Sequence, residues 1–253
     1  HDVSLLGSAT FDNVAFPVAN LRSEWLGVDV GSPTVAGSEG YSMGKFTVRG
    51  AGHDIWGDVD QFHFVYKDLP GDGEIVARVL SQTNTNPWAK AGIMIKESTT
   101  AFSPYTFLAV TPSNGIHFQY NLTGDITGGS YSMPYWLKLT RSGSTVASYI
   151  SSDGNNWILV GTKSIQMNGV VKVGLATTSH SGDVLGIAEF DNVNTSSSQF
   201  PNGWLDADIG APSVSGFAKF TSGVYEVAGA GHDVWSDMDQ FHFVYQPIVG
   251  DGE

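Results

Sequence analysis

The segment Gly50-Ala-Gly-His-Asp-Ile-Trp-Gly-Asp-Val-Asp-Gln-Phe-His-Phe-Val-Tyr66 decides the fold, because aromatic residues alternate with others in its second half. Phe62, Phe64 and Tyr66 would share one face of an extended chain, and His63 and Val65 the other. A period of two is typical of a β-strand with one face against a core. The Gly-rich start of the segment favours a turn or a close backbone approach.

The same period continues through the residues that follow. Ile93 and Ile95 share a face opposite Met94 and Lys96. Gly- and Asn-rich turns separate the alternating stretches, and no stretch shows the 3.6-residue period of a helix. We expect further strands over 74–80, 106–110, 116–120, 136–140, 145–150, 157–160, 171–177 and 186–193. About ten strands in one unit predict an all-β two-sheet sandwich, or jelly roll.

The segment occurs twice. Gly229–Tyr245 repeats Gly50–Tyr66 at an offset of 179 residues, and Trp204-Leu205 repeats Trp25-Leu26. Without gaps, residues 1–74 and 180–253 are identical at 35 positions. Chance does not produce such identity, so the sequence contains a tandem repeat.

The phase of the repeat predicts the domain organisation. Residues 1–14 match the last strand of a preceding repeat, and 15–193 form one complete sandwich. Residues 194–199 are a short polar linker, and 200–253 are the first third of a following repeat. We interpret the chain as a segment of a longer array. Exchange of strands between neighbouring molecules is the alternative.

Several motifs of the complete unit together resemble one bacterial family. They include Trp88-Ala-Lys-Ala-Gly-Ile-Met-Ile-Lys96, Tyr135-Trp-Leu-Lys-Leu-Thr-Arg141 and Phe190-Asp-Asn-Val193. The run resembles concanavalin A-like lectin/glucanase domains, which are related to the regulator-of-enolase domain and to the C-terminal sandwich of β-xylosidases. The resemblance implies an accessory module of a secreted, multi-domain protein that associates with glycans. Family members often carry Arg where this chain has Lys96.

Composition narrows the possible partners. The chain has 12 basic and 25 acidic residues, a net charge of −13, and no Cys. Nucleic-acid binding is excluded because it needs a basic footprint, and no apolar run is long enough for membrane insertion. A polysaccharide, metal cations or neighbouring copies of the same repeat remain as partners.

Sugar binding needs exposed aromatic rings with polar groups nearby. We select Trp56, Trp88, Lys96 and Tyr131 as candidate ligand-binding residues. Trp88 and Tyr131 follow loop sequences, which favours exposure. The alternative is that these aromatic residues belong to the core, where large aromatic side chains are common.

Asp54, Asp58 and Asp60 crowd one loop and recur as Asp233, Asp237 and Asp239. Oxygen ligands at alternating spacing suit calcium, which is the one cofactor that the sequence suggests. Alternatively, the three carboxylates accept hydrogen bonds from backbone amides in turns. His53 and His63 could bind zinc together with nearby Asp residues, but a strand His that faces away from Phe62 and Phe64 is more often packed or hydrogen-bonded.

Catalysis is not expected. A β-glucanase of this fold carries the pattern Glu-x-Asp-x-x-Glu on one strand, whereas this chain offers only Asp58-Val-Asp60. We therefore predict a non-catalytic, adhesive, carbohydrate-binding repeat of a long bacterial surface protein, located outside the cell or on its surface. The alternative is a structural building block of a filament, stalk or sheath, and a glycoside-active enzyme is the third possibility.

Overall fold

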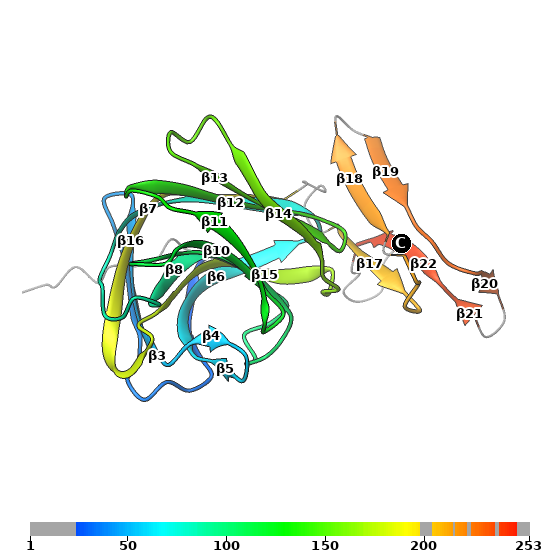
Figure 1. Cartoon of the computed structure of the whole chain (residues 1–253). Coiled ribbons are helices and arrows are strands. Elements are labelled where there is room, and N and C mark those ends of the chain that lie inside the picture. Colours follow the sequence, from blue (N-terminus) through cyan, green and yellow to red (C-terminus); the bar gives the residue numbers. More distant parts are fainter. Residues whose placement is uncertain (1–23, 198–203, 215, 222–223, 236–237, 247–253) are drawn as a thin grey trace, which may run out of the picture.

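The computed structural model describes residues 24–197 and 204–246, except 215, 222–223 and 236–237. The predicted last strand of a preceding repeat, 1–14, lies outside the described residues. Residues 24–197 form two antiparallel sheets packed face to face, and no helix occurs in the described part of the chain (Figure 1). The prediction of an all-β two-sheet sandwich is confirmed.

Each sheet of the sandwich has seven strands. In order across the first sheet, the strands are β1 (Leu26–Val30), β6 (Phe62–Pro70), β15 (Val170–Thr178), β8 (Lys90–Lys96), β9 (Tyr105–Thr111), β10 (Gly115–Tyr120) and β11 (Gly124–Gly129). Across the second they are β14 (Ile158–Ser164), β13 (Thr145–Ser151), β12 (Tyr135–Ser142), β7 (Gly73–Gln82), β16 (Ser181–Ser197), β3 (Lys45–Gly52) and β2 (Ser38–Ser42).

The main core fills the space between the sheets. Ile93 and Ile95 of β8 belong to it, as does Val65 of β6. Met94 faces the other way, into a second apolar cluster on the outer face of the first sheet. The strand β16 continues to Ser197, so that residues 194–197 pair with β7 instead of starting the predicted linker.

His63 connects the two sheets at their edge. Its Nδ1 lies 2.7 Å from Asp29 Oδ1 on β1, and its Nε2 lies 2.7 Å from Glu39 Oε2 on β2. Both ring nitrogens therefore have a carboxylate partner, one on each sheet. We call these three residues the histidine clasp. The interpretation of His63 as a hydrogen-bonded residue agrees with this geometry.

The second copy repeats the first strands of the sandwich. Its elements are β17 (Leu205–Ile209), β18 (Phe217–Thr221), β19 (Val224–Ala228), β20 (Val234–Trp235), β21 (Met238–Asp239) and β22 (Phe241–Tyr245). Leu205 pairs with Tyr245 just as Leu26 pairs with Tyr66, which is the same register at the offset of 179. Figure 1 shows this copy to one side of the sandwich.

Candidate functional site

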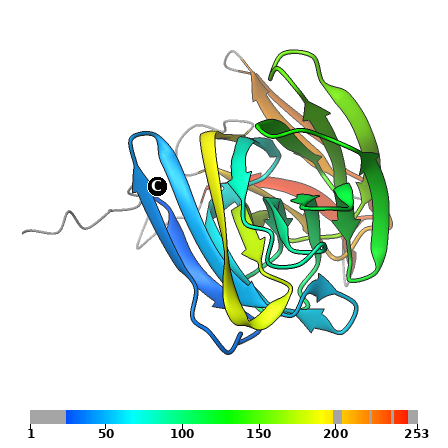
Figure 2. The ribbon, with the colours of Figure 1, turned by 60° about the vertical axis from the view of Figure 1, so that its left-hand side comes forward.

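The outer face of the first sheet is covered over only part of its area. A small hairpin, β4 (Ile55–Trp56) and β5 (Val59–Asp60), folds over this face (Figure 2). Ile55 packs there against Phe62, Phe64 and Met94 in the second apolar cluster. At the tip of the hairpin the Gly57 amide donates to the Leu122 carbonyl oxygen at 2.8 Å, which ties the hairpin to the turn after β10. Beside the hairpin the sheet stays open.

A pocket of about 360 Å³ occupies this open part of the face. Its size falls within the range of small-molecule sites, about 300–1,000 Å³. Five separate parts of the sandwich supply its walls. The lining residues are Asp54, Trp56, Trp88, Lys90, Gln119, Asp125 and His180. We call it the tryptophan pocket.

Two indole rings border the pocket from different elements. Trp56 on the hairpin is 36% exposed, and Trp88, just before β8, is 41% exposed. The Trp88 amide donates to Asn86 Oδ1 at 2.8 Å, and its ring lies 5.2 Å from the imidazole of His117. Trp88 is therefore held in place while much of its ring stays accessible. The negatively polarised face of an indole attracts the C–H groups of a sugar ring.

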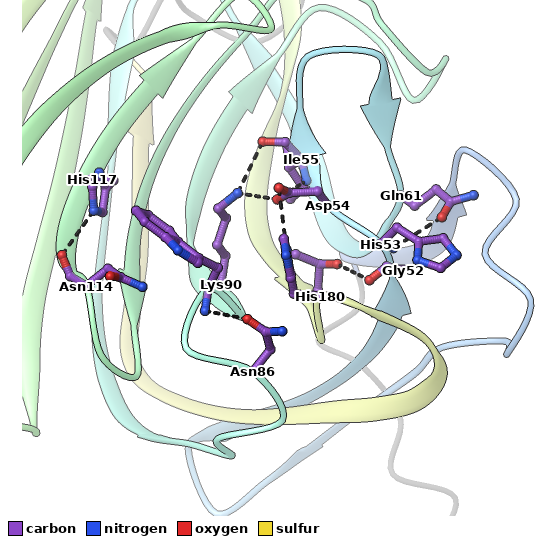
Figure 3. A network of polar contacts seen from close by, with 12 residues as sticks. Gly52, His53, Asp54, Ile55, Gln61, Asn86, Lys90, Asn114, His117 and His180 are labelled. Atoms are coloured by element: carbon purple, nitrogen blue, oxygen red, sulfur yellow. Dashed lines mark hydrogen bonds and ion pairs between the residues drawn. The ribbon is translucent and has the colours of Figure 1, made fainter.

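A network of charged groups lies under the rings. Lys90 Nζ donates to Asp54 Oδ1 and reaches the Ile55 carbonyl oxygen at 3.5 Å, and His180 Nδ1 lies 3.4 Å from Asp54 Oδ2. Figure 3 shows Lys90 and His180 converging on Asp54. Burial lowers the pKa of Lys90, and the charge of Asp54 opposes that shift. Because Asp54 also accepts the Ile55 amide at 2.7 Å, its carboxylate is firmly positioned.

The far wall of the pocket carries a second ion pair. His117 Nδ1 lies 2.9 Å from Asp125 Oδ2, and His117 Nε2 lies 3.1 Å from the carbonyl oxygen of Asn114. Each carboxylate of the pocket therefore lies within hydrogen-bond distance of a nitrogen-bearing side chain, Lys90 for Asp54 and His117 for Asp125.

Gln119 lies between these two ion pairs with an unused acceptor. Its side chain on β10 is 3% exposed, and its Oε1 has no hydrogen-bond partner. An unsatisfied buried polar group costs about 1–3 kcal/mol. A ligand hydroxyl that donates to Oε1 would recover this cost, so the pocket already contains a polar group that fits a hydroxylated ligand.

The other two predicted ligand-binding residues lie away from the tryptophan pocket. Lys96 is fully buried, and its Nζ donates to Asp60 Oδ2 and to the Ser103 carbonyl oxygen, both at 3.0 Å. Burial lowers the pKa of Lys96, while Asp60 opposes the shift. The sequence pattern placed Lys96 on the outer face correctly, but the second apolar cluster covers that part of the face. Lys96 therefore holds the hairpin and has no access to a ligand.

Tyr131 borders a different, shallow pocket of about 430 Å³, with Asn84 and Pro112 in its lining. Its hydroxyl donates to the Thr111 carbonyl oxygen at 2.8 Å. Burial raises the pKa of Tyr131 to about 12. Tyr131 also packs edge-on against Tyr135, which fits a packing role.

The acidic loop does not assemble a calcium site. Asp54 is paired with Lys90, whereas Asp60 accepts from Lys96 and from the Phe102 amide at 2.6 Å. Asp58 is exposed in the turn of the hairpin. Among the described residues no group of three or more His, Cys, Asp or Glu side chains is arranged to hold a metal ion. The residues present do not fit calcium, and the alternative of amide-bonded turn carboxylates describes Asp54 and Asp60.

Sequence reasoning missed Lys90, Gln119, Asp125 and His180. They come from four elements that only the folded sheet brings together. The sole local signal was the alternation of 116–120, which puts His117 and Gln119 on one face. Whether His117 and Gln119 lie next to a pocket depends on how far the β4–β5 hairpin extends over the sheet. The local sequence around these two residues does not encode the extent of the hairpin.

Comparison with solved structures agrees with this architecture. A functionally unknown protein from Saccharomyces cerevisiae matches with a TM-score of 0.55 and 17% identity over 69% of this chain and 97% of that protein. The GH43 protein BlXynB from Bacillus licheniformis matches with a TM-score of 0.51 and 17% identity. The chain has a concanavalin A-like fold. The alignment with BlXynB covers 75% of this chain but only 40% of the length of BlXynB.

A third similar structure is the carbohydrate-binding module CBM66 from Bacillus subtilis, with a TM-score of 0.45 and 15% identity over 69% of this chain and 96% of that module. No protein-family model matches the chain, and no curated protein matches it significantly. Within the described ranges of the concanavalin A-like sandwich and the second copy, no helix is long and apolar enough to cross a membrane.

Proposed function

We propose that this chain binds a carbohydrate without cleaving it, through the tryptophan pocket. The observation that supports this most is that Trp56, Trp88 and Gln119, whose buried Oε1 has no partner, line the same pocket. A sugar ring offers C–H groups on its faces and hydroxyls at its rim, and the pocket offers a complement to each. The two ion-paired carboxylates favour a neutral sugar, because a uronate would bring an uncompensated negative charge next to Asp54 and Asp125.

The absence of catalysis is part of the proposal. Glycoside hydrolysis uses two carboxyl groups, of which one must act as a protonated acid. In this pocket Asp54 is ion-paired with Lys90 and Asp125 with His117. Each carboxylate is thus already engaged by a basic side chain of the protein. Incubation with candidate oligosaccharides should therefore release no shorter products.

We further propose that the module acts outside the cell as one of several copies along a surface protein. The internal repeat and the resemblance to accessory modules of secreted proteins support this. Copies joined in one chain convert weak single-site binding into avidity, since the second contact becomes intramolecular. Adhesion to a polysaccharide would use this effect.

A glycan array followed by calorimetry on the full chain tests the proposal. Trp88→Ala should weaken binding about tenfold or more, which corresponds to about 1.4 kcal/mol. Trp56→Ala should have a similar effect. The matched control is Trp235→Ala: Trp235 is the copy of Trp56, is 78% exposed, and has no copy of Trp88 beside it in this sequence. Equal losses in the Trp235 and Trp56 variants, or no glycan bound at all, would refute the pocket as the site.

A further inference from the structure

The second copy contacts the end of the sandwich that is formed by three turns. These turns are Gly71–Gly73, Arg141–Ser144 and the segment 166–169. A Cβ added to Gly169 would lie 2.3 Å from the Asp206 carbonyl oxygen, and its three nearest heavy atoms outside the adjacent residues all belong to the second copy. A Cβ added to Gly143 would lie 3.1 Å from the Gly216 carbonyl oxygen. Two glycines of the sandwich thus allow the backbone of the second copy to approach closely.

Arg141 makes this end of the sandwich rigid. Its guanidinium donates to the carbonyl oxygens of Gly71 and Gly169 at 3.1 and 3.2 Å and to that of Asn168 at 2.8 Å. Asp72 Oδ1 accepts the Gly143 amide at 2.6 Å. The three turns therefore form one fixed surface, which we call the socket. Its rigidity means that it can receive a partner without first becoming ordered.

A polar cavity of about 300 Å³ lies between the socket and the second copy. Asp72 and Arg141 line it from the sandwich, and Asp206 and His242 line it from the second copy. Asp206 is only 7% exposed. Its Oδ2 lies 3.1 Å from His242 Nε2, whereas its Oδ1 is buried without a partner. Asp206 thus both lines the joint and supplies one carboxylate oxygen to the clasp of the second copy.

In each copy a carboxylate lies beside Nε2 of the clasp histidine, but the two copies supply it from different positions. Position 206 corresponds to Gly27, and Ala218 corresponds to Glu39. A Cβ on Gly27 would lie 2.3 Å from Glu39 Cδ, so the Glu39 carboxylate occupies the space that an Asp at 27 would take. Each carboxylate binds Nε2 of the clasp histidine. The Glu39 side chain is 24% exposed, and Leu26 on the same surface is 59% exposed.

We propose that copies of this unit dock head to tail, so that the socket of one copy receives the β1-side surface of the next copy. In the second copy this surface consists of β17 and Gly216. In the complete sandwich the equivalent surface consists of β1, Gly37 and Glu39. The occupant of the open surface around β1 is thus the socket of another copy. The contact is heterologous, because two different surfaces meet, and such contacts give a ring where the rotation between copies closes and an open line where it does not. Successive tryptophan pockets then face in fixed relative directions.

Nuclear relaxation and proteolysis of the full chain test the joint. In the unchanged protein the amides of β17 and β22 should tumble with the same correlation time as those of the sandwich. Gly169→Ala should uncouple them and raise proteolysis within the second copy about tenfold or more, since cleavage follows the open population. The melting of the sandwich should change little, because the atoms nearest to the added methyl belong to the second copy. Thr162→Ala, on exposed β14 outside the cavity lining, is the control. Independent tumbling in the unchanged protein, or no effect of Gly169→Ala, would overturn the joint.

The open surface around β1 is tested by freeing the socket. Ala207→Trp places a bulky ring on the second copy's side of the cavity and should displace that copy. The freed socket should then bind the β1 surface of another molecule, so sedimentation should show concentration-dependent chains of molecules. Ala207→Trp combined with Gly169→Ala should stay monomeric. A monomeric Ala207→Trp variant at millimolar concentration, or association that survives Gly169→Ala, would overturn head-to-tail docking. Neither test involves a sugar, so both are independent of the carbohydrate proposal.

Discussion

The two copies of the repeated segment have the same strands but different surroundings. In the sandwich Phe64 and Val48 are fully buried, whereas their counterparts Phe243 and Val227 are 45% and 48% exposed. The strand pairing is nevertheless the same in both copies, and in both the clasp histidine lies between two carboxylates, of which only the one at Nδ1 comes from the same position. The comparison separates two levels of the fold. Residues 25–66 specify their own pairing, whereas burial requires the strands contributed by residues 73–197.

We expect the largest difference between the two copies when the same aromatic ring is removed from each of them. Phe64→Ala should destabilise the sandwich by about 4 kcal/mol, because it leaves a cavity among Phe62, Tyr66 and the second apolar cluster. Phe243→Ala should change the same transition by less than about 0.5 kcal/mol, as is usual for exposed positions. Urea unfolding of the full chain, followed by near-ultraviolet circular dichroism, measures both. Similar losses in the two variants would mean that the second copy is folded as deeply as the first.

An exchange of clasp residues tests whether the two copies hold the clasp histidine in equivalent ways. Glu39→Ala alone should cost about 1–3 kcal/mol by leaving His63 Nε2 unpartnered in a buried site. Gly27→Asp alone should also destabilise, since its Cβ would meet the Glu39 carboxyl group. The double variant reproduces the arrangement of Asp206 and Ala218, so we expect it to lie within about 0.5 kcal/mol of the unchanged protein.

A double-mutant cycle of unfolding free energies measures this coupling. The control is Glu39→Gln, which keeps the size of the side chain and an acceptor for His63. Additive losses in the double variant would show that the two clasps are not equivalent, and that the second copy does not predict the chemistry of the first.

The smallest predicted effect is a pH dependence that only the second copy should have. Burial raises the pKa of Asp206, and Arg141 opposes this shift. Burial also raises the pKa of Asp72, and the charge of Asp206 adds to that shift. Protonated carboxyls are thus favoured in the joint. The stabilisation of the joint is fully present below the ordinary Asp pKa of 3.8 and is lost as pH rises through the raised pKa values of the docked state. The charged and titratable residues lining the joint are Asp72, Glu97, Arg141, Asp206, Asp208 and His242.

Hydrogen–deuterium exchange of β17, corrected for intrinsic rates, measures this dependence. Exchange should become a few-fold faster, relative to β1, as pH rises from acid to neutral. Asp206→Asn should make the rate less dependent on pH, whereas Glu39→Gln should leave it unchanged. A pH dependence that is equal in β1 and β17 would show that the joint is not its source.

Local patterns predicted the fold well because the strands follow a period of two. The opposite orientation of Ile93 and Met94 is an example. The candidate site was only partly predictable. Trp56 and Trp88 do lie in one pocket, but Lys96 is covered and Tyr131 lies elsewhere. Gln119, Asp125 and His180 reach the pocket through strand order, which depends on contacts between residues far apart in the sequence. The Asp triplet resembles a calcium loop locally, yet two buried lysines from another strand neutralise two of its members.

The long strand β16 has a mechanical consequence. It lies between β7 and β3 near the middle of its sheet, and the chain leaves it at Ser197 toward the second copy. Tension applied to the chain beyond Ser197 would run along this strand. The ladder to β7, from Ala188 to Ser197, would then be loaded in shear, with its hydrogen bonds sharing the force instead of breaking one after another. The strand that completes the sandwich is therefore also placed to let each unit carry load in a stretched chain.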